Sequence, residues 1–337
     1  MIKYAPNLLQ LCITDFCQLK CKHCYFGEHT RLKEMSIEDI LLTVDKFILL
    51  RNKFIADGRI CREPLPSLNI SGGEPMLHTK LKTIIKRIAP KFYNVKFLSN
   101  GLLYSKDVCE LLCKYSNRLV YQISLDGMKE SHEFIRGKNT FDKTVSNILQ
   151  LKKDFPEIFL QISFNSNNIN YRDILPLTEF VKTLGCDMIF FDRFVPYGNS
   201  LDIRSVTMDE YLDVVSSIEK AYQLYNSDTF IVYKNRSMQS DGDYFCGAGV
   251  FNQICVPSGD RYICSRYQIK SGNWLKDDVD TLYYNAIDIE SKVLQLPEEC
   301  NNCKHKNVCN GGMRCLTYAL TNEIKRRDVH CYRYEKE

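Results

Sequence analysis

Three cysteines near the amino terminus have the spacing of a metal site. Cys17, Cys21 and Cys24 are separated by three and by two residues. Three thiolates can bind three irons of a cubane cluster, which leaves the fourth iron open to another molecule. Two alternatives stay open on these residues alone: ordinary loop cysteines, and a zinc site completed by His23.

A second concentration of cysteines lies towards the carboxyl terminus. Of the 16 cysteines, eight fall between Cys246 and Cys331. Secreted disulfide scaffolds are short, whereas this chain has 337 residues, and its amino terminus does not read as an export signal. In a reducing compartment, clustered cysteines bind metal or do redox chemistry. We therefore expect a cytoplasmic protein with a second metal-binding region, with a zinc ribbon as the alternative to iron–sulfur clusters.

The composition excludes several classes of partner. The hydrophobic fraction is 45% and the charged fraction 26%, as in ordinary globular proteins. A net charge of +4 gives no electrostatic reason to expect nucleic acid. No run of residues is long and apolar enough for a membrane span, so no membrane association is predicted.

The first cysteines must be positioned by secondary structure, and the sequence alternates short apolar segments with longer amphipathic ones. Six short segments, apolar almost throughout, predict strands buried on both faces, at 8–14, 67–71, 95–100, 121–126, 159–165 and 187–194. Amphipathic segments predict helices at 36–50, 78–89, 105–115, 140–153, 172–185 and 207–226. This alternation predicts parallel βα units, either in an open doubly wound sheet or in a barrel. We expect one domain over 1–235 and a cysteine-rich domain over 236–337.

The first cysteine loop also resembles a known signature. With Tyr25 after the last cysteine, its spacing resembles that of the radical S-adenosylmethionine (SAM) superfamily, and the resemblance continues in Gly72-Gly73-Glu74-Pro75 after the second strand. The resemblance implies that the backbone of this motif and the Glu74 carboxylate bind the amino group of SAM. Adjacent glycines allow close approach of a ligand, and a carboxylate accepts from an ammonium.

Further matching residues follow later strands. Ser124 and Asp126 follow the fourth strand, and Arg136 comes shortly after. The resemblance implies that the polar pair contacts the ribose and that the arginine lies near the methionine carboxylate. Asn100 and Asn165, which end the third and fifth strands, match further positions of the SAM pocket. The resemblance thus favours an α/β fold with a partial (βα)6 TIM-like barrel.

The carboxy-terminal cysteines resemble the SPASM extension of the same superfamily, which carries auxiliary 4Fe-4S clusters. One departure is the spacing of five residues between Cys309 and Cys315, where the family usually has three. The resemblance implies one catalytic and two auxiliary clusters. One auxiliary cluster would be held by Cys300, Cys303, Cys309 and Cys331, and the other by Cys246, Cys264 and Cys315. Cys255 is either a fourth ligand of the latter or a core residue on a strand.

The resemblance implies an enzyme that generates a 5′-deoxyadenosyl radical and abstracts hydrogen from its substrate. We expect a ribosomally made precursor peptide, with a cross-link, thioether or epimer as the product. Only 16 residues precede Cys17, so we expect leader recognition from a separate protein, and flavodoxin or ferredoxin as electron donor. The alternatives are a small-molecule or sulfatase-maturing oxidoreductase and a non-catalytic iron–sulfur electron carrier.

Overall fold

The computed structural model describes residues 3–26, 33–199, 202–234 and 246–331. Its strands form one sheet in the order β10-β9-β8-β1-β2-β3-β4-β5-β6-β7. Strand β8 and strands β1 to β7 run parallel, whereas β9 and β10 are antiparallel to their neighbours. The strands are β1 Leu8–Cys12, β2 Ser67–Ser71, β3 Asn94–Ser99, β4 Leu119–Ser124, β5 Phe159–Ser166, β6 Met188–Arg193, β7 Ile231–Lys234, β8 Asn252–Cys255, β9 Asp260–Cys264 and β10 Tyr267–Asn273.

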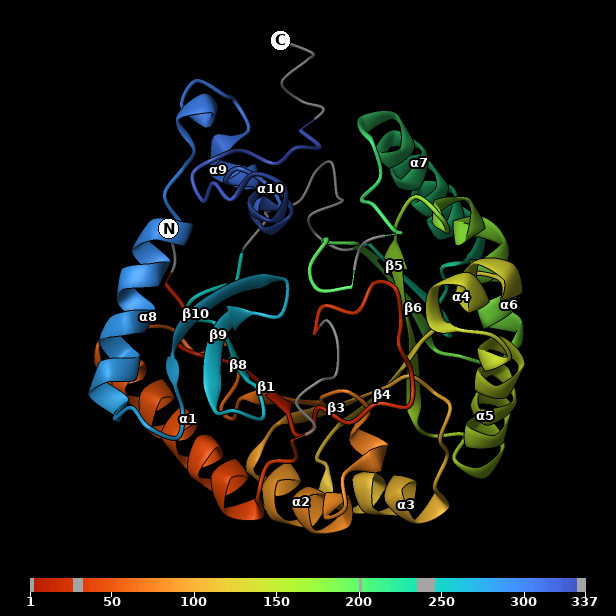
Figure 1. The fold of residues 1–337 in the computed structure, drawn as a ribbon, viewed down its shortest axis with the longest axis horizontal. Coiled ribbons are helices and arrows are strands. Elements are labelled where there is room, and N and C mark those ends of the chain that lie inside the picture. Colours follow the sequence, from red (N-terminus) through yellow and green to blue (C-terminus); the bar gives the residue numbers. More distant parts are fainter. Residues whose placement is uncertain (1–2, 27–32, 200–201, 235–245, 332–337) are drawn as a thin grey trace.

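Helices cover the outer face of this curved sheet, and the sheet remains open between β10 and β7 (Figure 1). The short helices α9 and α10 lie beside its β10 end, across the opening from α7 (Figure 1). The helices are α1 Ile37–Ala56, α2 Leu81–Ile88, α3 Lys106–Tyr115, α4 Lys129–Arg136, α5 Thr140–Asp154, α6 Ile174–Thr183, α7 Met208–Tyr225, α8 Val279–Val293, α9 Lys306–Cys309 and α10 Arg314–Thr321.

The predicted βα units are confirmed. Periodicity left open whether they form an open doubly wound sheet or a barrel, and the structure is a partial barrel. Each expected strand and helix has a counterpart, and α1 begins where Ser36 Oγ accepts a hydrogen bond from Asp39 N at 3.0 Å. Helices α4, α8, α9 and α10 were not predicted. The expected boundary between 235 and 236 falls outside the described residues and stays a prediction, but β8 pairs directly with β1, so the cysteine-rich segment continues the sheet of the barrel.

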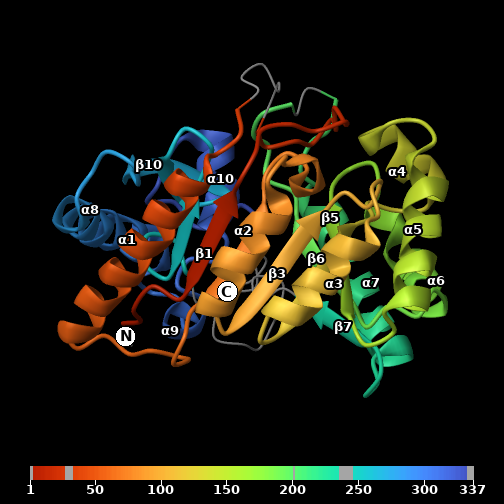
Figure 2. The ribbon, with the colours of Figure 1, turned by 90° about the horizontal axis from the view of Figure 1, so that it is seen from below.

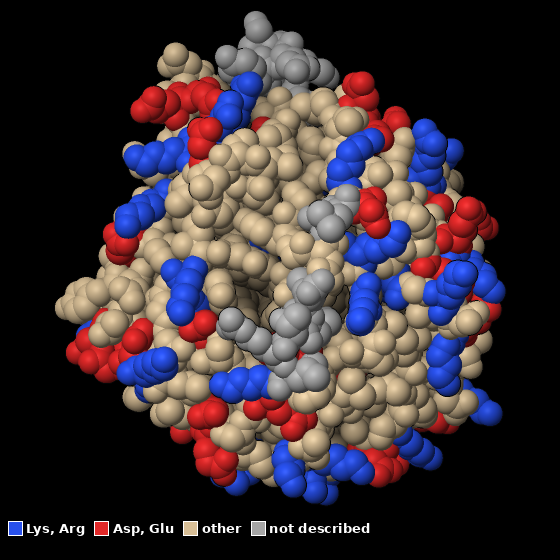
Figure 3. Space-filling model, in the orientation of Figure 1, with Lys and Arg blue, Asp and Glu red and all other residues tan. Residues whose placement is uncertain are grey.

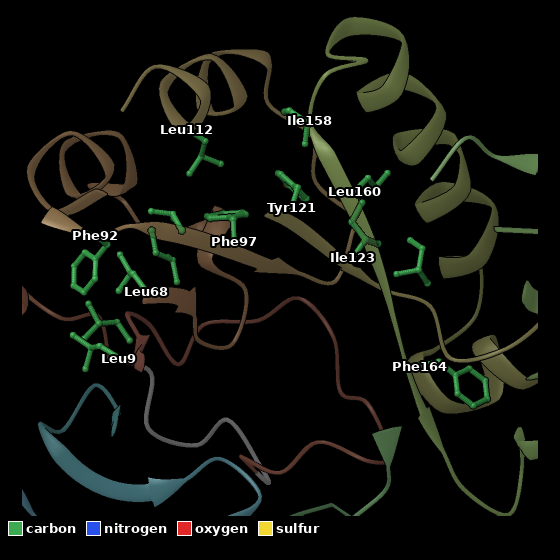
Figure 4. Close-up of a cluster of buried hydrophobic side chains, with 14 of the residues drawn as sticks. Leu9, Leu68, Phe92, Phe97, Leu112, Tyr121, Ile123, Ile158, Leu160 and Phe164 are labelled. Carbon is green, nitrogen blue, oxygen red and sulfur yellow. The ribbon is translucent and has the colours of Figure 1, made fainter. Parts of the chain in front are cut away.

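The inner face of the strands is more polar than the apolar runs predict. On the outer face, alternate apolar side chains pack against the helices (Figure 4). On the inner face, Gln10, Asn69, Lys96, Gln122 and Gln161 line a cavity instead. Successive side chains of a strand point to opposite faces, so one strand serves both surroundings. The runs concealed this alternation because their polar residues are few and stand among apolar ones.

The parallel strands end at one edge of the sheet, where the loop after β1 also lies (Figure 2). The loops that follow β1 to β6 therefore meet around the inner cavity, as in other barrels of parallel strands. On the opposite side of the sheet, α8 is held by the Arg59–Glu290 ion pair, whose nitrogen and oxygen are 2.7 Å apart. No helix in the described residues is long and apolar enough to cross a membrane.

Candidate active site

A cavity of about 460 Å³ opens on the inner side of the strand ends. A hollow is visible in this face of the molecule, with most charged side chains around it (Figure 3). Most of the residues predicted for the site line the cavity. They are Cys17, Cys21, Cys24, Tyr25, Gly72, Gly73, Asn100, Ser124, Arg136 and Asn165. Cys264 of the second cysteine group lines the same cavity.

The loop after β1 presents its three thiols to this cavity. Cys24 N donates to Cys21 O at 3.1 Å, which closes a tight turn between the second and third cysteines. Leu19 N at 3.5 Å and Asn100 Nδ2 at 3.7 Å both donate to Cys17 Sγ. Burial raises the pKa of Cys17 and brings that of Cys21 to about 12, so the thiols stay protonated until a metal displaces the proton.

The three thiols fit a cubane cluster better than a single ion. Each thiolate of a cubane binds a different iron, so the three need not converge on one point. Among the described residues, no group of three or more histidine, cysteine, aspartate or glutamate side chains could hold one metal ion. The zinc alternative completed by His23 therefore gains no support from the geometry.

His23 instead belongs to a buried network around Asp126. The Asp126 carboxylate is fully buried, with its Oδ2 2.6 Å from Arg136 Nε and 2.6 Å from His23 Nε2. Asn165 N donates to Asp126 Oδ1 at 3.1 Å. Burial alone would raise the pKa of Asp126, but the Arg136 guanidinium and His23 hold it well below its usual range.

This network fixes Arg136 at the wall of the cavity. Arg136 NH1 lies 4.0 Å from Cys21 Sγ, so the guanidinium places positive charge beside the first cysteines. Asp126 itself does not line the cavity, but it holds Arg136 and His23, which do. His23 lines the cavity, and its buried Nδ1 has no hydrogen-bond partner among the residues that the structure describes.

The Gly72-Gly73-Glu74-Pro75 loop packs tightly on the first cysteine loop. A Cβ added to Gly73 would lie 2.3 Å from Phe16 O, so only glycine fits against this backbone. Glu74 N donates to Phe16 O at 2.7 Å. The two glycines face the cavity, whereas Pro75 is buried behind it at the start of a 3₁₀ turn.

Glu74 is fully buried behind the cavity wall. Its carboxylate accepts hydrogen bonds from Asn100 N at 2.8 Å, Ser99 Oγ at 3.0 Å and Met76 N at 3.1 Å. Burial raises the pKa of Glu74 to about 7 despite these donors. The carboxylate thus ties the loop after β2 to the end of β3. Its expected contact with the amino group of SAM stays a prediction, since the structure does not bring the side chain onto the cavity lining.

The carboxy-terminal cysteines fall into two groups. Cys246, Cys264 and Cys315 pack against one small apolar cluster. Cys300 is buried, and its pKa is raised to about 11 by burial, with a further contribution from its neighbours Cys331, Cys309 and Cys303. The resemblance implies the same two sets as cluster ligands, and that role stays a prediction.

Cys255 does not join either group. It lies on β8 with its side chain fully buried, and its Sγ is 3.8 Å from Thr43 Oγ1 of α1. The adjacent Ile254 faces the cavity. Since neighbouring side chains of a strand alternate between faces, Cys255 points into the outer core. The structure therefore favours the core alternative for Cys255 over the ligand alternative.

Polar residues on β6 and between β9 and β10 complete the cavity and were not predicted. Asp192 at the end of β6 forms an ion pair with Arg266, between β9 and β10. Arg193, fully buried, forms an ion pair of 2.7 Å with Asp328 and lies 3.2 Å from His330 Nδ1. Asp192 follows the same strand-end rule as Ser124 and Asn165, so its position could have been inferred. The Arg193–Asp328 contact could not be predicted from the sequence because 135 residues separate its partners.

Comparisons with known proteins agree with this geometry. A profile of the Radical SAM superfamily matches residues 11–181. The antilisterial bacteriocin subtilosin biosynthesis protein AlbA of Bacillus subtilis is 25% identical over 330 residues, covering 94% of this chain and 69% of AlbA. The mycofactocin maturase MftC of Mycolicibacterium smegmatis is 24% identical over 350 residues, covering 97% of this chain and 83% of MftC.

The fold is shared with solved structures. Streptococcus suis SuiB, bound to the precursor peptide SuiA, superposes with a TM-score of 0.71 and 17% identity over 98% of this chain and 77% of SuiB. Strand order, cysteine loop and sequence profile thus lead to one conclusion. This chain belongs to the radical SAM superfamily and is an enzyme that uses a 4Fe-4S cluster together with S-adenosylmethionine.

Proposed function

We propose that this enzyme abstracts hydrogen from a ribosomally made peptide and leaves it cross-linked, thioether-bridged or epimerised. The observation that supports this proposal is the shared cavity, in which Cys264 of the second cysteine group lies with Cys17, Cys21 and Cys24. A substrate in this space would have one cysteine site on each side. Of the relatives, AlbA is named for bacteriocin biosynthesis, and SuiB was solved with a precursor peptide.

We assign the following roles to residues of this chain. Cys17, Cys21 and Cys24 would hold the catalytic cluster, and Arg136 would face the bound SAM from the cavity wall. When bound, cluster and SAM supply a one-electron cleavage that yields a 5′-deoxyadenosyl radical. Asp126 keeps the Arg136 guanidinium in place, and the buried cavity wall excludes water from the reacting atoms.

Two auxiliary clusters form the second part of the proposal. Cys300, Cys303, Cys309 and Cys331 would close one, and Cys246, Cys264 and Cys315 would hold the other. Because Cys255 points into the outer core, we propose that the latter has three cysteine ligands and one open position. A non-catalytic electron carrier would have no use for the open cavity beside the first cysteines. Flavodoxin or ferredoxin as reductant, a separate leader-recognition protein and a cytoplasmic location belong to the same proposal.

Iron content tests the cluster assignment. The reconstituted protein should hold roughly 12 irons, four for each cluster. A value of roughly 4 would eliminate the auxiliary pair.

Co-expression with a short precursor peptide encoded beside this chain tests the reaction. Mass spectrometry should show loss of hydrogen for a cross-link, or deuterium uptake at an α-carbon in heavy water for an epimer. Cys309→Ala should still cleave SAM but give no modified peptide, and Cys61→Ala, outside all three cysteine groups, should behave as wild type. Full product from Cys309→Ala would refute the role of the auxiliary clusters, and active SAM cleavage with an unmodified peptide would refute the substrate assignment.

A further inference from the structure

The inner face of the barrel carries a band of amide side chains with one cation among them. Gln10, Asn69 and Lys96 are direct neighbours across β1, β2 and β3. Gln122 and Gln161 are direct neighbours across β4 and β5. All five line the main cavity. Barrel interiors are normally filled with branched apolar side chains, so a polar band on five successive strands needs another explanation.

The Lys96 ammonium lies inside this band. The adjacent Val95 and Phe97 are fully buried in the outer core, which directs the Lys96 side chain inward. Lys96 Nζ donates to Gln161 Oε1 at 3.1 Å, and Gln161 Nε2 donates to Gln122 Oε1 at 3.0 Å. Gln161 is thus held in the orientation that turns its oxygen towards the lysine.

No carboxylate of the described residues forms an ion pair with Lys96. Other buried cations near the cavity have one: Arg136 pairs with Asp126, and Arg193 pairs with Asp328. Burial lowers the pKa of Lys96 to about 8, and no charged neighbour contributes to the shift. Lys96 is half-buried, and a charge partly withdrawn from water without a counter-ion is costly unless something compensates it. An ammonium with one acceptor has two donors left. Among the described residues Lys96 therefore lacks a counter-ion, and an anionic group that enters the cavity would supply one.

We propose that Lys96 binds a carboxylate of the substrate, with Gln161 and Gln122 holding the ammonium in place. This rests on the proposed function, because it names the class of group that enters the cavity. A peptide offers this chemistry from two sources, an aspartate or glutamate side chain and the terminal carboxylate. The three-donor ammonium would orient the bound residue relative to the first cysteines, which makes Lys96 a specificity-determining residue.

Binding of small probes to the reconstituted full-length protein with SAM tests this site. Saturation-transfer NMR compares two matched pairs of probes, N-acetylglutamate amide with N-acetylglutamine amide, and N-acetylalanine with N-acetylalanine amide. The wild type should bind the acid of one pair roughly tenfold tighter than its neutral partner. A preference in the first pair identifies a side-chain carboxylate as the ligand, and a preference in the second identifies the terminal carboxylate. Lys96→Gln should lose the preference, Lys96→Arg should keep it, and Lys86→Gln on the exposed face of α2 should match wild type.

Peptide-independent SAM cleavage serves as the second readout. It should be unchanged in Lys96→Gln, which shows that the variant is folded and that the lysine does not hold SAM. A higher KM for SAM in this variant would overturn the proposal, as would equal binding of acid and amide by the wild type. Retention of the acid preference without peptide modification would reject the peptide substrate but keep the carboxylate site.

Discussion

Asp126 and Asp328 are both buried and paired with a buried arginine, but they join very different stretches of chain. Asp126 Oδ2 lies 2.6 Å from the Nε of Arg136, ten residues further on. Asp328 Oδ2 lies 2.7 Å from an Nη of Arg193, at 135 residues' separation. The first pair fixes a loop on its own barrel, whereas the second fastens the carboxy-terminal segment to β6.

The surroundings of the two pairs also differ. Around the first pair, strands and helices share one large apolar core. The second holds a region in which α9 has four residues and α10 has eight. Its buried apolar clusters are small: Ala248, Ile263, Tyr267 and Val293 form one, and Val195, Met313 and Leu316 form another. Small domains with little core commonly depend on bound metal. We therefore expect the barrel site to be arranged in advance and the carboxy-terminal cysteine region to depend on its clusters.

Removal of iron should give the largest contrast. Without iron, amide hydrogen exchange in residues 298–331 should accelerate roughly 100-fold or more, because binding of metal to the folded form alone stabilises that form. Strands β1 to β6 should change little. Mass spectrometry of peptides from the apo and reconstituted proteins measures both regions in one experiment. Equal acceleration in the barrel strands would show that the two regions unfold together.

Asp126→Asn should lower SAM cleavage by roughly 10- to 100-fold, because Arg136 loses the carboxylate that orients it. The free energy of unfolding should fall by about 3–5 kcal/mol, since a buried guanidinium is left unpaired. Rates of 5′-deoxyadenosine formation and urea denaturation check the two effects.

Asp328→Asn is the matched variant in the other region. It should cost a similar amount of stability but leave SAM cleavage near the wild-type rate. Equal loss of cleavage in both variants would remove the distinction between the two pairs.

Glu74→Gln should change how stability depends on pH. Between the ordinary pKa of 4.5 and the folded pKa of about 7, the folded chain keeps a proton on Glu74 that the unfolded chain releases. Stability therefore falls as pH rises through this window, and Glu74→Gln should gain about 2 kcal/mol relative to wild type between about pH 5 and about pH 8. Urea midpoints at both pH values measure this.

Asp328→Asn should show the opposite trend. Burial acts against ionisation of Asp328, but Arg193 holds its pKa below the ordinary value. Its contribution is therefore present above about pH 4 and is lost as the pH falls below that value. A parallel pH dependence of the two variants would contradict the assigned directions.

Gly73→Ala should have the smallest effect, a loss of SAM cleavage of roughly tenfold, because the new Cβ pushes the Phe16 backbone and displaces the cysteine loop. In the carboxy-terminal region, Gly312 has a φ of +72°, and an added Cβ would lie 2.6 Å from Asp328 Cβ. Gly312→Ala should lower stability without slowing cleavage. Steady-state rates and thermal unfolding separate the two, and slower cleavage in Gly312→Ala would contradict the comparison.

Residues near a strand end were predictable, because a parallel sheet brings its strand ends together. Cys17, Gly72, Asn100, Ser124 and Asn165 all line the cavity on this rule. Contacts between distant segments were not predictable. Arg193 and Asp328 carry no shared pattern, and α8 packs on α1 only because β8 extends the sheet beside β1.

The inner face of the barrel was missed for a different reason. A polar residue within an apolar run, such as Lys96 in β3, looks like an interruption until neighbouring strands are aligned. Cys255 was ambiguous because its face of β8 depends on the register of pairing with β1.

Anaerobic cleavage of SAM tests the central assignment most directly. The reduced, reconstituted wild type should convert SAM to methionine and 5′-deoxyadenosine, and so should Cys113→Ala, which changes a partly buried cysteine of α3. Cys21→Ala should give no 5′-deoxyadenosine, because the cluster loses one of its three thiolates. Cleavage by Cys21→Ala at the rate of Cys113→Ala would contradict the assignment of Cys17, Cys21 and Cys24 as the catalytic cluster site.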